Sequence, residues 1–256
     1  MEIIKELKKD ALKRILLQGK RQDGRHMYDY RPISIQKNAI PNAEGSALCH
    51  LGNTQVLAGV KFDVATPFAD RPTEGILSTG CELVPLASDS FEPGPPSPES
   101  IELARVVDRG IRSSGCLDLK SFFLEEGKVL ALYVDLYVLD YDGNFFDAAA
   151  LAAMAALTCT RMPKVEAQKI IRTESVGALP LNRKAVTCTF AKVDEHKLLD
   201  PSLDEERGMD GRLTIATTGE NVCAMQKGGW GAFTKKDILE CVDISFERSK
   251  ELCSLF

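Results

Sequence analysis

Residues 128–154 read "KVLALYVDLYVLDYDGNFFDAAALAAM" and join a strand to a helix through one glycine turn. The β-branched and aromatic residues predict a long strand, and residues 147–160 have so few polar side chains that they predict a buried helix. A strand, a turn at Gly143 and a helix start form the usual frame of an anion pocket, because free backbone N–H groups point out of the helix. Yet no Arg, Lys, Ser or Thr stands in the turn residues Asn144, Phe145, Phe146 and Asp147. The stretch therefore predicts either a phosphate site or the remnant of one.

Patterns on both sides of this stretch predict an α+β fold of two related sheet-and-helix halves. Residues 43–64 predict a hairpin around a turn at 51–54, and residues 98–114 predict a helix capped by Ser97 and ended by Gly115. Residues 63–80 lack a regular pattern and 81–87 predict a short strand. In the second half, strands are expected at 184–193, 212–218 and 221–229, and an amphipathic helix at 234–256. The expected division is an N-terminal helix (1–19) and two halves, 20–163 and 164–256.

Composition excludes several classes of protein. The net charge of −5 means that a nucleic acid would have to contact a local basic patch or charges from a partner. The eight cysteines include no CxxC pair and the three histidines are scattered, so we expect reduced thiols, no zinc site and no other bound metal. The charged start and the lack of a long apolar run predict a cytoplasmic protein without a membrane span.

Three clusters of charged residues are candidates for function. On the helix at 98–114, Arg105, Arg109 and Arg112 stand at i, i+4 and i+7, so their guanidinium groups share one face. This face is either simply solvated or a row of cations that binds the phosphates of a ligand. An acidic connection at 198–211 is either a Mg²⁺ or acid–base site or an exposed loop, and it contains Asp200, Asp204, Glu205, Glu206 and Asp210. A basic segment precedes the first strand and contains Lys20, Arg21, Arg25 and Arg31. Local salt bridges to Asp23 and Asp29 could hold this segment in place.

The motif "RQDGRHMYDYRPI" at 21–33 resembles the entry motif R-x-D-G-R-x-x-x-D-x-R-P-I of RNase PH-like phosphorolytic exoribonucleases. Residues 45–60, 100–114 and 200–218 are similar to that family's first hairpin, core helix and carboxylate segment. Within the family, the chain most resembles the non-catalytic RNase PH-like subunits of the archaeal exosome. The resemblance implies an RNase PH-like fold and a cytoplasmic hexameric ring of three heterodimers with an active paralogue. It also implies RNA-binding cap proteins and single-stranded RNA, which is degraded 3′ to 5′.

The sequence departs from active members of the family at two places. The phosphate turn lacks its anion-binding Arg, and Asp147 puts a carboxylate where phosphate would have to sit. An Arg pair that precedes Ser-Ile-Glu in active members is replaced by Pro98 and Glu99. Asp204 and Asp210 keep the family's spacing of six.

The resemblance and these departures together predict a non-catalytic, RNA-binding structural subunit. It would bind no cofactor, inorganic phosphate would be used by the partner, and Arg105, Arg109 and Arg112 would contact RNA. The segment at 21–33 would be an interface or scaffold element. Two alternatives remain: an active exoribonuclease that uses Asp204 and Asp210, and a ring scaffold without RNA contacts.

Overall fold

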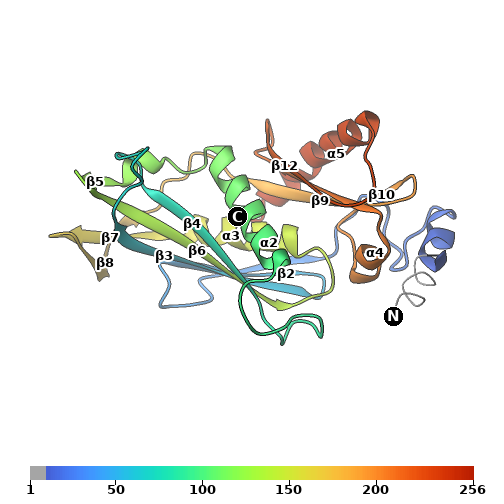
Figure 1. Ribbon diagram of the computed structural model, residues 1–256, viewed down its shortest axis with the longest axis horizontal. Helices are drawn as coiled ribbons and strands as arrows, with labels where there is room; N and C mark the ends of the chain where they lie inside the picture. Colours follow the sequence, from blue (N-terminus) through green and yellow to red (C-terminus); the bar gives the residue numbers. More distant parts are fainter. Residues whose placement is uncertain (1–9) are drawn as a thin grey trace.

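The structure is a computed structural model that describes residues 10–256 (Figure 1). Its first sheet has six strands in the order β1-β2-β3-β6-β4, with β5 paired to β6. Every pairing is antiparallel except that of β4 with β6, which is parallel. The strands are β1 (Ile33–Lys37), β2 (Gly45–Leu51), β3 (Thr54–Ala65), β4 (Ile76–Leu83), β5 (Phe123–Glu125) and β6 (Lys128–Asp140), and a short 3-10 helix, η1 (Leu119–Phe122), precedes β5.

The second sheet has four antiparallel strands in the order β10-β9-β11-β12. They are β9 (Val186–Val193), β10 (His196–Leu199), β11 (Gly211–Thr217) and β12 (Val222–Gly229). Helix α4 (Leu203–Gly208) lies between β10 and β11 in sequence, and α5 (Lys235–Cys253) packs against β9 and β11. A separate two-stranded hairpin joins the two parts of the chain: β7 (Arg161–Glu166) and β8 (Lys169–Ala178).

Helix α3 (Phe145–Cys159) is the shared core of the two sheets. It packs against β2 and β3 on one side and β9 on the other, and α2 (Pro98–Ser114) packs on it as well. Its backbone lies close to the first sheet at Gly45, where a Cβ would be 2.6 Å from the carbonyl oxygen of Ala156. One hydrophobic cluster therefore runs from Phe62 in the first sheet to Phe190 in the second.

Several predicted features are confirmed. The hairpin turns between Leu51 and Thr54, which face each other across it. Ser97 caps α2 by accepting from the backbone N–H of Ser100, and Gly115 ends the helix with φ +66°. The N-terminal helix predicted within residues 1–19 is described from residue 10, is helical to residue 16 and ends before Gly19; residues 1–9 lie outside the described range.

Other boundaries were wrong. Strand β4 starts at Ile76, inside the stretch predicted to be irregular, and α3 starts at Phe145 instead of residue 147. The acidic connection at 198–211 holds the end of β10 and helix α4, so it is not a loop. The β7–β8 hairpin was not predicted at all, because most of β8 is exposed and the strand lacks a regular apolar alternation. No helix within residues 10–256 is long and apolar enough to cross a membrane.

Candidate functional site

The turn between β6 and α3 has the backbone of an anion pocket. Gly143 has φ +89° and lies so close to the start of α4 that a Cβ there would be 2.5 Å from the backbone nitrogen of Leu203. Asn144, with φ +51°, caps α3 by accepting from the backbone N–H of Asp147 at 3.3 Å. The strand, glycine turn and helix start predicted from the sequence are therefore present, and the turn packs against the start of α4.

A carboxylate of the chain itself occupies this turn. Glu206 of α4 accepts a hydrogen bond from the backbone N–H of Asn144 at 2.9 Å, and it also accepts from the hydroxyl of Tyr141. Burial raises the pKa of Glu206. An N–H group at the start of a helix is the donor that a bound anion would use. Glu206 thus occupies the N–H of Asn144, a contact that its position in the sequence did not reveal.

The two phenylalanines of the turn are packed into the core. Phe145 and Phe146 are 6% and 1% exposed. They continue a row of rings that begins with Phe91 and Tyr141, with successive centroids 5.3, 5.1 and 4.8 Å apart. The guanidinium of Arg212 lies 3.8 Å from the centroid of Phe146. These rings stabilise the start of α3 and do not line an open pocket.

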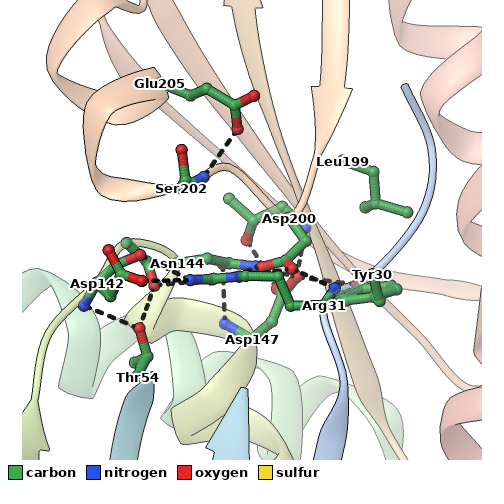
Figure 2. Close-up of polar contacts among 12 residues, drawn as sticks. Tyr30, Arg31, Thr54, Asp142, Asn144, Asp147, Leu199, Asp200, Ser202 and Glu205 are labelled. Carbon is green, nitrogen blue, oxygen red and sulfur yellow. Dashed lines mark hydrogen bonds and ion pairs between the residues drawn. The ribbon is translucent and has the colours of Figure 1, made fainter. Parts of the chain in front are cut away.

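The prediction that Asp147 places its charge in the phosphate position was wrong. Its carboxylate is fully buried and accepts hydrogen bonds from five donors at 2.7–2.9 Å: Tyr30 Oη, Asn144 Nδ2, Thr187 Oγ1, and both the backbone N–H and Oγ1 of Thr189. Burial nevertheless outweighs these bonds and raises the pKa of Asp147 to about 6. Asp147 therefore joins α3 to β9 inside the molecule (Figure 2).

The basic segment at 21–31 and the acidic segment at 200–206 turn out to be partners. Both oxygens of buried Asp200 bind Arg31, at 2.8 and 2.9 Å, and one of them also binds Arg25 at 2.9 Å. Arg21 forms a bidentate salt bridge with buried Glu205: its Nε and Nη2 donate to the two carboxylate oxygens at 2.9 and 2.5 Å. The exposed acidic loop and the purely local salt bridges considered from the sequence are therefore both wrong, although Arg25 does also bind Asp23.

This network reaches the turn directly. Arg31 donates to the carbonyl oxygens of Asp142 and Gly143 at 2.7 and 3.1 Å, and Asn144 Nδ2 donates to Asp200 at 2.8 Å. Figure 2 shows Arg31 lying between Asp200 and the turn. The conformation of residues 142–144 is thus fixed by ion-paired side chains from both ends of the chain.

The two carboxylates with the family's spacing lie in α4 and just after it. Asp204 is partly exposed in its first turn, and Asp210 directly precedes β11. Asp210 accepts from the backbone N–H of Asp194 at 2.8 Å, which ties it to the β9–β10 turn. Within residues 10–256, no group of three or more His, Cys, Asp or Glu side chains is arranged to hold a metal ion.

A second feature is an open groove of about 430 Å³ between β4 and α2. Arg105, Arg109 and Arg112 all line it and are exposed, so the structure brings the three predicted arginines together. Arg112 donates to both carboxylate oxygens of Asp108 at 3.0 Å and to the carbonyl oxygen of Leu77 at 2.9 Å. The groove therefore offers guanidinium groups on a rigid helix, which suits a ligand with several phosphates.

The chain is similar to known proteins along most of its length. Models of the 3′ exoribonuclease family match the chain at residues 29–163 (domain 1) and 185–248 (domain 2). The Exosome complex component Rrp42 of Methanothermobacter thermautotrophicus is 46% identical over 257 residues, which cover 98% of this chain and 95% of the relative.

Solved structures are similar over nearly the whole chain. A chain of the Archaeoglobus fulgidus exosome with RNA bound to the active site superposes with a TM-score of 0.91 at 43% identity, covering 98% of both chains. A chain of an archaeal exosome core has a TM-score of 0.86 at 41% identity, covering 98% of this chain and 96% of the other.

The raised pKa of Asp147 predicts a specific dependence of stability on pH. A carboxyl whose pKa is higher in the folded state adds stability at low pH, and that contribution is lost as pH rises from the unfolded value through about 6. Asp147→Asn removes this titration. The free energy of unfolding in urea, wild type minus variant, should therefore fall by roughly 2 kcal/mol between pH 4 and 7.

The control is Asp70→Asn, which changes a carboxylate that is 78% exposed and reports the general effect of pH on such a substitution. A wild-type minus Asp147→Asn difference that stays constant from pH 4 to 7 would contradict the assignment.

Proposed function

This chain belongs to the 3′ exoribonuclease (RNase PH) family, and from that premise we propose that it is a non-catalytic, RNA-binding subunit of an archaeal exosome core ring. In this proposal an active RNase PH-like paralogue pairs with it, and three such heterodimers close the ring. The ring carries RNA-binding cap proteins and degrades single-stranded RNA from 3′ to 5′. The partner uses inorganic phosphate, and this chain needs no cofactor.

The observation that carries the non-catalytic role is the carboxylate of Glu206 at the backbone N–H of Asn144. Phosphorolysis requires phosphate as the nucleophile, and phosphate in this turn would meet Glu206 in place of an arginine. Two like charges about 4 Å apart repel by about 1 kcal/mol in water and by several times more near protein. Arg212, the guanidinium beside the turn, is already stacked on Phe146 and paired with Glu102 at 2.6 Å.

The groove between β4 and α2 supports the RNA-binding role. Single-stranded RNA presents a phosphate at each nucleotide, and arginines one or two helical turns apart match such a ligand. The net charge of the chain is −5, so RNA must be held by a local strip of positive charge. Arg105, Arg109 and Arg112 form that strip, and Asp108 offsets part of its charge.

Two other functions would follow from different observations. The kept spacing of Asp204 and Asp210 would support an active enzyme that binds phosphate elsewhere. The internal bonds of Arg112 would suit a ring scaffold without RNA contacts. The next two experiments separate these functions from the proposed one.

The first experiment measures phosphorolysis. Poly(A) in phosphate buffer should not be shortened by this chain alone and should be shortened, with release of ADP, by the ring assembled with its active partner. Asp204→Asn in this chain should leave the rate of the ring within about twofold of wild type, since the reaction is expected at the partner's site. Robust shortening by the chain alone, or a hundredfold loss in the Asp204→Asn ring, would show that this chain is catalytic.

The second experiment measures RNA binding by the ring. Reversing two charges with Arg109→Glu and Arg112→Glu should weaken the binding of oligo(A) at least about tenfold. It should also reduce the slope of log K against log salt by about 1.4, because about 0.7 is expected for each phosphate contact on a single strand. Preference among RNA sequences should stay the same, since phosphate contacts carry no sequence information.

Arg14→Glu is the matched control, a charge reversal at an exposed arginine of the N-terminal helix. If the double variant binds RNA with the affinity and salt slope of this control, the ring-scaffold function is correct and the arginine strip has no role in RNA binding.

A further inference from the structure

The three arginines of the groove are not held in the same way. Arg112 is fixed by Asp108 on its own helix and by the carbonyl oxygen of Leu77 on β4. Arg109 lines the same groove, but its Nη1 donates to Oε1 of Gln226 on β12 of the second sheet at 3.3 Å. Arg109 is therefore tethered to the second half of the molecule, although α2 belongs to the first.

Gln226 has its amide oriented by a second contact. Its Nε2 donates to Oε1 of Glu102 at 3.2 Å. An ionised carboxylate only accepts hydrogen bonds, so the amide nitrogen must face Glu102, and the amide oxygen is left for Arg109. Glu102 and Arg109 are seven residues apart on one face of α2, about 10.5 Å along the axis, and Gln226 bridges them.

The other end of this chain of contacts is the altered turn. Glu102 accepts from Nη2 of Arg212 at 2.6 Å, and Arg212, only 9% exposed, stacks on Phe146 at the start of α3. Gly228 leaves room for this arginine, because a Cβ there would lie 2.8 Å from its Nη2. The contacts thus run without a break from Phe146 through Arg212, Glu102 and Gln226 to Arg109.

We propose that Gln226 is a positioning residue for RNA binding: with Glu102 and Arg212 it holds the guanidinium of Arg109 over the groove, anchored on the phenyl ring that stands in the former phosphate turn. This inference rests on the proposed RNA-binding function. A tethered arginine has fewer rotamers to lose when it binds a phosphate, so the tether strengthens binding without adding a charge. Gln226 acts only through Arg109.

The test compares RNA affinities of the assembled ring, measured by fluorescence anisotropy with labelled oligo(A). Gln226→Met keeps the length of the side chain but removes its hydrogen bonds, and it should weaken binding about threefold. Arg109→Ala should weaken binding about tenfold. The double variant should bind no more weakly than Arg109→Ala, because a residue that acts through Arg109 has nothing left to position.

The salt dependence separates positioning from loss of charge. Arg109→Ala should lower the slope of log K against log salt by about 0.7, whereas Gln226→Met should leave the slope unchanged. Gln36→Met, at an exposed position of β1, is the matched control and should match wild type in both affinity and slope. The melting temperature of each ring is measured alongside, so that a loss of folding is not read as a loss of positioning.

The possible failures are distinguishable. Wild-type affinity in Gln226→Met, together with weakened binding in Arg109→Ala, would overturn the positioning role and leave the proposed function intact. Additive losses in the double variant would likewise show that Gln226 does not act through Arg109. Wild-type affinity in Arg109→Ala would remove this arginine from the RNA path, and the positioning role with it.

Discussion

The structure depends on a single buried carboxylate, that of Asp200, which accepts hydrogen bonds from distant parts of the chain. Arg25 and Arg31 bind it from the N-terminal segment, and Asn144 binds it from the start of α3. Removing one partner from a buried ion pair typically destabilises a protein by about 3–5 kcal/mol, because the other charge is left without compensation. Asp200 is therefore a strong constraint on how the two sheets meet, and α3 lies at that junction.

This constraint explains how the turn keeps its shape in a subunit that we propose to be non-catalytic. In the turn itself, Arg31 fixes the carbonyl groups of Asp142 and Gly143, Glu206 takes the N–H of Asn144, and Asp147 is committed to the strand beside it. The backbone N–H groups of Asn144 and Asp147 therefore both have internal partners. Phe146, at the start of α3, also holds Arg212, and Arg212 connects the turn to α2 through Glu102.

Local features of the sequence predicted much of the fold but little of this network. The hairpin at Leu51 and Thr54, the Ser97 cap and the buried alanine helix follow from residues close together in the chain. The pairing of Arg31 with Asp200 spans 169 residues, and no periodicity reports it. The basic segment at 21–31 and the acidic segment at 200–206 therefore look unrelated in the sequence. The direction of the Asp147 side chain could not be predicted either, because residue type and sequence position do not determine which way a carboxylate points at the start of a buried helix.

We propose that the chain closes its own phosphate turn and leaves phosphate to a partner. The most direct measurement is an experimental structure of the assembled ring with inorganic phosphate and a short RNA. We expect Glu206 at the backbone N–H of Asn144, phosphate only in the partner's turn, and RNA phosphates beside Arg105 and Arg109. Phosphate bound to the N–H of Asn144, with Glu206 displaced, would contradict this proposal.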